Sequence, residues 1–332
     1  MVPTINLCTA ILPGSSFYDV VEIARVSGYQ GIELRVDAQY HKSLEELRRE
    51  GKQIQRVLEQ ARLQLPILSS YIPLDDQQSI DTLLYCCQNM GVPKARLVLP
   101  RSAQAAVVRQ AQTEAIIPSY DARQEPRALL ASVRKTLHRL ERRASVAGVQ
   151  VLLELHWGTV MSSFSSAYSF IHDLDPDSIA ITFDPANMLV EGKEDWEFGI
   201  KLLQPHLANV HVKNMRWSTN HAGWVWAWAP LTRGMVDWPD IVTLLKQNHY
   251  AGDYAIEDFL TPSTSKPATV AYLARARSQF FDIYEQASTA GAIVQNVEPT
   301  MIQVWRHPAR VAPAAEDTLT INARKISEGY HV

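Results

Sequence analysis

The sequence predicts an α/β fold, a (β/α)8 TIM barrel with a C-terminal extension, and three observations indicate it. Short runs rich in β-branched and apolar residues alternate with longer segments of helical apolar spacing, a pattern typical of parallel strands joined by crossover helices. Eight such units fill residues 4 to about 287, the size expected of a closed barrel. The turn Leu12–Ser16 after the first strand lacks the glycine spacing of a phosphate-binding turn, which argues against a doubly wound open sheet.

Each predicted strand is a short apolar run bounded by turn residues. The eight strands are predicted at Thr4–Ala10, Gly31–Val36, Pro66–Tyr71, Ala95–Leu99, Gln150–Leu155, Ile179–Phe183, Ala208–Val212 and Tyr254–Glu257.

The clearest predicted helix spans about 126–147, because apolar residues recur there at steps of three or four and form one stripe. That stripe consists of Leu130, Val133, Leu137, Leu140 and Ala144. The other helices are predicted at 44–62, 77–90, 164–174, 194–204, 238–248 and 266–287. Gly28, Gly91 and Gly148 each stand where a helix should stop before the next strand.

Residues 1–288 are therefore predicted to form the barrel as one domain. Residues 289–332 differ, because they combine scattered prolines and charges with one isolated apolar run, Met301–Trp305, and show no period that predicts a barrel element. We expect this C-terminal extension to be irregular or to form an arm that contacts another subunit of a homo-oligomer.

Composition excludes several classes of function. The chain is 46% hydrophobic and 20% charged, the usual mixture of a globular protein with a large core. A net charge of -3 gives no general attraction to nucleic acid or to an anionic membrane surface, so we expect neither partner. The three cysteines, Cys8, Cys86 and Cys87, cannot form a disulfide framework. With no secretory N-terminus and no apolar run of membrane-spanning length, a cytoplasmic location is expected.

Potential metal ligands stand at the carboxyl ends of four consecutive predicted strands. They are Glu154, Asp184, His211 and Glu257. The carboxyl ends of barrel strands meet at one face of the barrel. Strand alternation supports the set, since Val210 and Val212 can face the helices while His211 faces inward. Three carboxylates and one imidazole favour a single divalent metal ion, Mn, Mg or Co before Zn.

Each of these residues also has a simpler interpretation. An acid at the end of a strand is commonly a helix cap or half of a loop ion pair, and a single buried histidine is more often a satisfied core residue than a ligand. Caps have no reason to fall on the inward side of four neighbouring strands, however. The combination therefore favours a metal site over four unrelated structural roles.

The sequence resembles the sugar phosphate isomerase/epimerase family of xylose isomerase-like TIM barrels, over about residues 1–285. The matching stretches are Gly31–Leu34, Leu153–His156, Phe183–Asn187, His211–Asn214, Gly234–Trp238 and Tyr250–Gly252 with the following Ile256-Glu257. The resemblance implies that Glu154, Asp184, His211 and Glu257 are the metal ligands. It also implies that Glu154 and Glu257 are the catalytic pair that transfers the proton.

The expected function is therefore a divalent-metal-dependent isomerase or epimerase. Its substrate would be a sugar, a sugar phosphate or a related polyhydroxy ketone, and the proton would move through a metal-stabilised enediolate. One alternative is a metal-dependent dehydratase of a cyclic polyhydroxy ketone, and another is a non-catalytic barrel that binds a ligand. A related barrel class cuts DNA, but strands three and four end in Ser69-Ser70-Tyr71 and Leu99-Pro100-Arg101, without the extra ligands that such an activity needs.

Five further residues are candidates to bind a carbohydrate-like substrate. Glu33 and Arg35 share the inward side of strand two and could hold substrate hydroxyls, or else form an ion pair inside the barrel. His156 and Lys213 point in the same direction as the ligands two residues before them. Asn187 stands where epimerase relatives commonly carry a histidine, so this departure puts the substrate in question more than the metal.

The segment 214–233 follows strand seven and holds four of the eight tryptophans, Trp217 among them. A long loop at the active face of a barrel often serves as a lid, and aromatic rings offer flat apolar surfaces to sugars. We therefore predict a loop that covers the substrate, with Trp217 in contact with it. A packed loop or a subunit contact is the alternative.

Overall fold

The computed structural model describes residues 3–100, 125–221, 223–262 and 264–293. The chain divides into two units, Met1–Ala292 and Ile293–Val332, and the barrel lies in the first. Of the predicted C-terminal extension, residues 294–332 lie outside the described residues, so its conformation and its role as an arm stay predictions.

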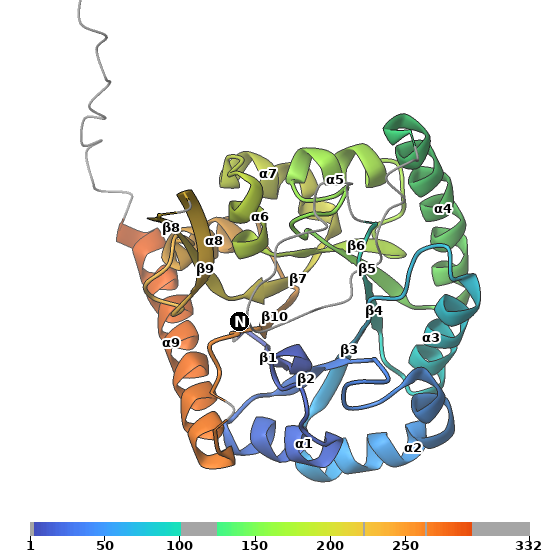
Figure 1. Ribbon diagram of the computed structural model, residues 1–332, viewed down its shortest axis with the longest axis horizontal. Coiled ribbons are helices and arrows are strands. Elements are labelled where there is room, and N and C mark those ends of the chain that lie inside the picture. Colours follow the sequence, from blue (N-terminus) through green and yellow to red (C-terminus); the bar gives the residue numbers. More distant parts are fainter. Residues whose placement is uncertain (1–2, 101–124, 222, 263, 294–332) are drawn as a thin grey trace, which may run out of the picture. The chain divides into compact units, whose positions relative to one another are not determined.

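Eight parallel strands close into a barrel, as predicted (Figure 1). They are β1 Ile5–Cys8, β2 Gly31–Arg35, β3 Gln64–Ser69, β4 Lys94–Leu97, β5 Gln150–Glu154, β6 Ile179–Phe183, β7 Leu207–Val212 and β10 Asp253–Ile256. Closure occurs between the first and last strands, where Leu7 of β1 pairs with Ile256 of β10. The first strand is shorter than predicted, because Thr9–Ile11 form a 3-10 helix, η1, in place of its last residues.

Helices surround the barrel (Figure 1). They are α1 Phe17–Val26, α2 Leu44–Ala61, α3 Gln77–Asn89, α4 Pro126–Ala147, α5 Phe164–Ile171, α6 Pro185–Glu191, α7 Trp196–Leu203, α8 Trp238–Gln247 and α9 Lys266–Ile293, with a short 3-10 helix, η3, at Gln204–His206. The ends of the helices are determined by capping residues in the local sequence. At the start of α2, Ser43 and Glu46 form a reciprocal capping box, and α4 ends at Gly148 with a φ of 62°, a conformation that glycine adopts without strain. Within the described residues, no helix is long and apolar enough to cross a membrane.

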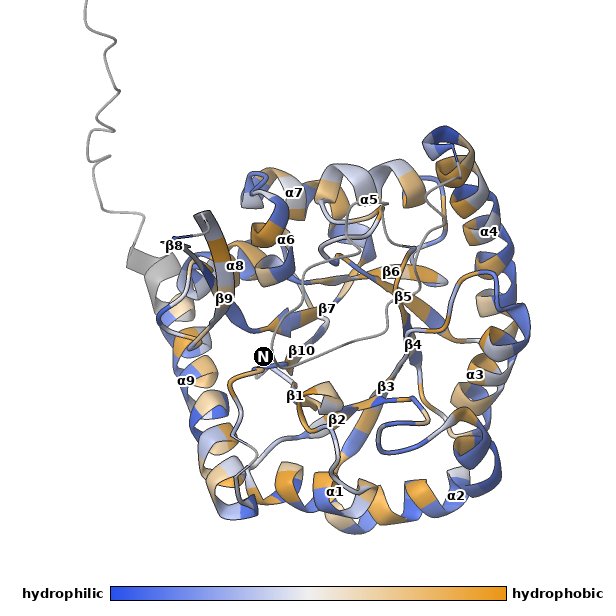
Figure 2. Ribbon diagram, in the orientation of Figure 1, coloured by the Kyte–Doolittle hydropathy of each residue, from blue (hydrophilic) through white to orange (hydrophobic). Residues whose placement is uncertain are grey.

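The apolar side of α4 differs by one residue from the prediction. Leu129 is 8% exposed and belongs to the core, whereas Leu130 is 43% exposed. The buried set therefore runs from Leu129 through Val133 and Leu137, at steps of four. Residue 130 lies about 100° around the helix from residue 129, which turns its side chain towards solvent. Figure 2 shows the resulting mixture of hydrophobic and hydrophilic residues along the outer helices.

A small apolar cluster, separate from the main core, consists of Ile67, Leu152, Ala180 and Ala208. Leu152 lies two residues before Glu154 on β5, so the two side chains are on the same side of the strand. The same alternation puts Ala180 on the side of Asp184. The cluster therefore forms an apolar floor under the polar residues at the carboxyl ends of the strands.

The segment after β7 is a β-hairpin, so the prediction of a loop there was wrong. Strand β8, Asn214–Asn220, pairs antiparallel with β9, Gly223–Ala229, and Trp217 stands opposite Trp226. The sequence carries a signal for this structure, because Trp224, Trp226 and Trp228 alternate with other residues at the period of a strand. Cross-strand aromatic pairs stabilise such a ribbon.

Candidate metal centre

The structure brings together the four residues predicted as metal ligands. Glu154 ends β5, Asp184 directly follows β6, His211 lies in β7 and Glu257 directly follows β10. One ligand atom from each residue lies within 4.8 Å of the others, and all four side chains are buried. Three carboxylates this close repel one another strongly in a buried site unless a cation balances them.

His211 uses its two ring nitrogens differently. Its Nε2 is 3.1 Å from each carboxylate oxygen of Glu33. Its Nδ1 faces the other three acids, at 3.2 Å from Glu154 Oε1, 3.3 Å from Glu257 Oε2 and 3.6 Å from Asp184 Oδ2. Although it is buried, this Nδ1 has no hydrogen-bond partner of suitable geometry in the part of the chain that the structure describes.

This arrangement fits a divalent cation. An imidazole that binds a metal through one nitrogen usually donates its other N–H to a carboxylate, which fixes the tautomer and the ring orientation. Glu33 occupies that outer position on His211. The orphaned Nδ1 and three carboxylate oxygens form a mixed nitrogen and oxygen donor set suited to Mn, Mg or Co, and acceptable to Zn.

Asp184 is both a helix cap and a member of the candidate ligand group, the two roles that the sequence suggested for it. Its Oδ1 accepts the backbone N–H of Asn187 at 2.9 Å and thereby caps α6. Its Oδ2 faces the His211 ring and accepts from the Lys213 ammonium at 2.7 Å. The side chain of Asn187 also donates to Asp184 Oδ2 at 2.8 Å and to Glu154 Oε1 at 3.3 Å. Asn187 therefore links two of the candidate ligands.

Lys213 neutralises part of the acidic cluster. Its Nζ contacts both Asp184 and Glu257, and it lies 5.0 Å from the ring centre of Trp228 and 5.3 Å from that of Phe259. Burial lowers the pKa of Lys213, but the charges of Asp184 and Glu257 outweigh this effect and raise the pKa above its usual value. The ammonium is therefore a fixed positive charge at neutral pH.

Arg96 on β4 is a site residue that the sequence analysis missed. Its guanidinium is buried, with Nε 3.1 Å from Glu33 Oε1 and Nη1 paired with Glu154 Oε2. Burial raises the pKa of Glu154, but the charges of Arg96 and His211 outweigh it, so the pKa lies below its usual value. The signal in the sequence was a charged residue within an apolar strand, because a buried charged side chain is usually paired with an opposite charge.

Glu33 and Arg35, the two charged residues on the inward side of β2, have different contacts. Glu33 contacts His211 and Arg96 and accepts from Asn209 Nδ2 at 3.1 Å. Arg35 does not pair with Glu33, and its Nη2 is 3.4 Å from Asp37 Oδ2. The internal ion pair considered for β2 therefore exists, but its cation is Arg96 and not Arg35.

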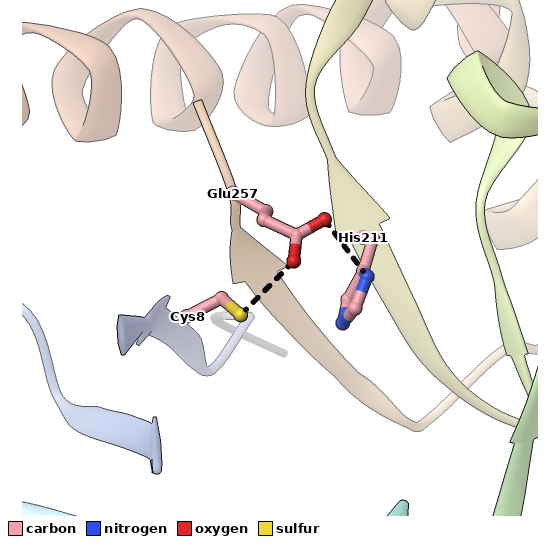
Figure 3. A group of neighbouring side chains, drawn as sticks. All are labelled: Cys8, His211 and Glu257. Carbon is pink, nitrogen blue, oxygen red and sulfur yellow. Dashed lines mark hydrogen bonds and ion pairs between the residues drawn. The ribbon is translucent and has the colours of Figure 1, made fainter. Parts of the chain in front are cut away.

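Cys8 is a second neighbour of the cluster that the sequence did not reveal. Its thiol donates to Glu257 Oε1 at 3.4 Å, while Glu257 Oε2 faces His211 (Figure 3). Burial and the charge of Glu257 raise the pKa of Cys8 well above its usual value, so the group stays a protonated donor. Cys8, His211 and Glu257 also lie close enough to share a cation. All three cysteines are free and buried.

Aromatic rings adjoin the cluster. Trp226 packs against Trp157 and Trp228 with ring centres 5.5 and 5.0 Å apart, and Trp228 stacks on Phe259 at 5.1 Å. Trp217, the predicted substrate contact, donates its indole N–H to Leu189 O at 2.9 Å and thus anchors the hairpin to α6. The tryptophan of the hairpin that approaches Lys213 is Trp228.

His156 lies beside this aromatic group. Its Nδ1 is 2.8 Å from the backbone oxygen of Trp157, and its ring meets the edge of Tyr71 with centres 6.4 Å apart. Burial lowers the pKa of His156, although the charge of Glu154 raises it. The predicted role of His156 as a substrate contact stays a prediction.

Comparison with known proteins gives the following matches. A family model described as xylose isomerase-like TIM barrel matches residues 21–277. No curated protein matches the sequence. Among solved structures, a xylose isomerase-like TIM barrel protein from Mycobacterium smegmatis in complex with magnesium has a TM-score of 0.61 and 18% identity, over 82% of this chain and 89% of that one.

Two further solved structures carry names of enzymes. An L-ribulose 3-epimerase has a TM-score of 0.61 and 18% identity, over 90% of this chain and 100% of its own. The probable 3-DHS dehydratase AsbF of Bacillus anthracis, involved in petrobactin synthesis, has a TM-score of 0.58 and 19% identity, over 81% of this chain and 97% of its own. At these identities the likeness establishes the fold alone.

Proposed function

The chain belongs to the xylose isomerase-like TIM barrel family, and on this premise we propose that it is a divalent-metal-dependent isomerase or epimerase. The substrate would be a sugar, a sugar phosphate or a related polyhydroxy ketone. One observation carries the proposal: the Nδ1 of His211 is buried, lacks a hydrogen-bond partner among the described residues and faces oxygens of three carboxylates.

We assign Glu154, Asp184, His211 and Glu257 as the residues that hold the cation. A bound divalent cation would supply positive charge to stabilise the negative charge that develops on substrate oxygens when a carbon-bound proton leaves. Glu33 keeps Nδ1 of His211 free by holding Nε2, and Asn187 fixes the carboxylates of Asp184 and Glu154.

Glu154 and Glu257 are the proposed proton-transfer pair. They stand on β5 and after β10, with β6 and β7 between these strands, so their carboxylates approach the centre from different directions. One carboxylate would take the proton from the carbon beside the carbonyl, and the other would return it. Return to the opposite face of the same carbon gives an epimer, whereas return to the neighbouring carbon interconverts aldose and ketose.

Three neighbouring groups support this chemistry. Arg96 holds Glu154 Oε2 and Cys8 holds Glu257 Oε1, while Asn187 and Lys213 contact the second oxygens, so both carboxylates are oriented by their neighbours. The rings of Trp228 and Phe259 lie 5.0 and 5.3 Å from the Lys213 ammonium, and the four candidate ligands are buried away from water. A dry, pre-oriented site strengthens the electrostatic interactions inside it.

A direct test combines metal analysis with isotope exchange. Purified protein loaded with Mn should bind one cation per chain and should exchange a carbon-bound proton of a ketose with deuterium from the solvent. Glu59→Gln, on the exposed side of α2, is a matched control that should retain the exchange. Protein that binds no divalent cation, or that binds one and exchanges no proton with any ketose tested, would refute the proposal.

A dehydratase of a cyclic polyhydroxy ketone is the second candidate, and the likeness to the probable dehydratase from B. anthracis favours it over a barrel that only binds a ligand. The same base can remove the proton, after which a hydroxyl leaves from the neighbouring carbon. Product analysis separates the two reactions, because dehydration lowers the mass by one water and creates a new ultraviolet chromophore, whereas isomerisation conserves the mass.

A further inference from the structure

Arg35, the last residue of β2, carries a buried positive charge with little compensation. Its side chain is 3% exposed, and its one ion pair among the described residues is the 3.4 Å contact between Nη2 and Asp37, whose own side chain is 37% exposed. Within the described part of the chain, Nε and Nη1 have no hydrogen-bond partner. A buried polar group left in this state costs free energy, which a complementary ligand would recover.

Aromatic rings hold the Arg35 guanidinium in place. Its central carbon lies 3.7 Å from the ring centre of Tyr71 and 5.2 Å from that of Tyr40. The backbone N–H of Arg35 also donates to Thr9 Oγ1 at 2.8 Å. A guanidinium stacked in this way keeps its N–H groups in a fixed plane, so little conformational freedom is lost when an acceptor binds.

Arg35 stands beside the candidate metal centre. The Tyr71 ring that contacts it also lies 5.2 Å from the guanidinium carbon of Arg96, which pairs with Glu154. Arg35 is two residues after Glu33 on the same strand, so both point to the inside of the barrel. A substrate bound at the cluster could therefore extend one end towards Arg35.

The charges of the centre balance without Arg35. Glu33, Glu154, Asp184 and Glu257 contribute four negative charges, and Arg96, Lys213 and a divalent cation bound to a neutral His211 would contribute four positive ones. Among the described residues, the charge on Arg35 is then in excess, apart from its long contact with Asp37. A neutral substrate would leave this excess in place, whereas a substrate anion would cancel it.

We propose that Arg35 binds an anionic substituent of the substrate, a carboxylate by preference, so that the natural substrate is a polyhydroxy keto acid. The substrate assignment rests on the proposed function, whereas the anion site requires only that the centre holds its cation. A guanidinium fork matches the two oxygens of a carboxylate. A phosphate usually takes more donors, and the neighbouring cations Arg96 and Lys213 already pair with carboxylates.

The anion site can be tested without a sugar. Thermal unfolding of the Mn-loaded full chain is measured with acetate and with its neutral analogue acetamide, for wild type, Arg35→Met and Arg216→Met. Arg216 is exposed on β8 and serves as the matched control. Acetate should raise the melting temperature of the wild type and of R216M more than acetamide does, because a ligand that binds the native state stabilises it. In R35M, acetate and acetamide should change the melting temperature equally.

The same variants distinguish a binding role from a structural one. Without ligand, R35M should melt at the wild-type temperature or above, because the substitution removes an uncompensated buried charge. An equal response of the wild type to acetate and acetamide would overturn the proposal. So would an R35M variant that melts lower without ligand and keeps the full response to acetate, since Arg35 would then only support the fold.

The substrate class is tested on the Mn-loaded full chain with D-fructose, D-fructuronate and D-fructose 6-phosphate. The wild type should bind D-fructuronate at least tenfold more tightly than D-fructose in calorimetric titrations, and R35M should bind both within twofold. Tighter binding of the phosphate than of the uronate would overturn the carboxylate assignment. Equal binding of all three by the wild type would overturn the inference and leave the isomerase proposal intact. Absence of any ketose turnover, with the acetate response preserved, would refute the proposed function and not the anion site.

Discussion

Glu33→Gln should weaken the binding of Mn while the fold is preserved. Both oxygens of Glu33 are 3.1 Å from Nε2 of His211, and the group is fully buried. Burial raises the pKa of Glu33, but the charges of His211 and Arg96 outweigh it and keep the carboxylate ionised. Glutamine retains the shape of the side chain and removes its charge, so His211 loses the charged acceptor that orients its ring and raises its basicity as a ligand.

The magnitude follows from the contacts that change. A hydrogen bond to a charged acceptor contributes about 1.5–3 kcal/mol and a neutral one about 0.5–1.5 kcal/mol, so the lost charge alone costs roughly 1.5 kcal/mol, or about tenfold in affinity. The new amide would also point its NH₂ at one of three donors, His211 Nε2, Arg96 Nε or Asn209 Nδ2. With this mismatch we expect Mn affinity to fall by about 10–100-fold.

The assay is a calorimetric titration of metal-free protein with Mn, for wild type, Glu33→Gln and the exposed control Glu59→Gln. Melting curves of the three metal-free proteins show whether the variants are folded. Glu33→Asp adds a second comparison, because it keeps the charge but shortens the side chain, and it should retain more affinity than the amide. Wild-type affinity in a folded Glu33→Gln protein would mean that His211 does not bind the cation through Nδ1, and the assignment of the centre would fail.

Three further outcomes follow. Glu257→Gln should abolish turnover and preserve the fold, and undiminished activity would reject its role in proton transfer. Cys8→Ala removes the donor to Glu257 Oε1 and should lower kcat about fivefold at saturating Mn, which is the effect of one hydrogen bond. Cys8→Ser keeps a donor and should have a kcat near that of the wild type. Equal kcat values for the two variants would show that this hydrogen bond does not affect catalysis. In chemical denaturation, Leu137→Ala should lower the free energy of unfolding by about 2–5 kcal/mol, because Leu137 is 0% exposed. Leu130→Ala should lower it by under about 1 kcal/mol, because Leu130 is 43% exposed. Similar losses for the two variants would contradict the observed buried face of α4.

The strands and the inward positions of the candidate ligands could be predicted because both depend on local alternation. Val210 and Val212 are buried in the main core while His211 between them faces the acidic cluster, as a strand of period two requires. The same reasoning located Glu257 on an inward position, next to the outward Ile256. The gathering of ligands at one face needs no knowledge of contacts, because parallel barrel strands all end at that face.

Features that depend on competing local signals were harder to predict. Helix α6 begins at Pro185 directly after its cap Asp184, a recognisable start signal, but no helix was predicted there, because the cap and the metal ligand were weighed as alternatives for this aspartate. The hairpin β8–β9 was interpreted as a loop because its length and tryptophan content suggested a lid, although its residues alternate like a strand. At α4, Leu129 and Leu130 are both apolar, and only packing decides which of them is buried.

The partners of the ligands could not be predicted, because barrel closure creates them. All four candidate ligands come from the second half of the barrel, from β5 onwards, whereas Cys8, Glu33 and Arg96 stand on β1, β2 and β4. Cys8 meets Glu257 across 249 residues of sequence, at the seam where β1 pairs with β10. Local patterns identify residues that point inward but not which of them meet across the barrel. The first half of the barrel thus orients the candidate ligands that the second half supplies, so on the proposed assignment a cation should bind with full affinity only to the closed barrel.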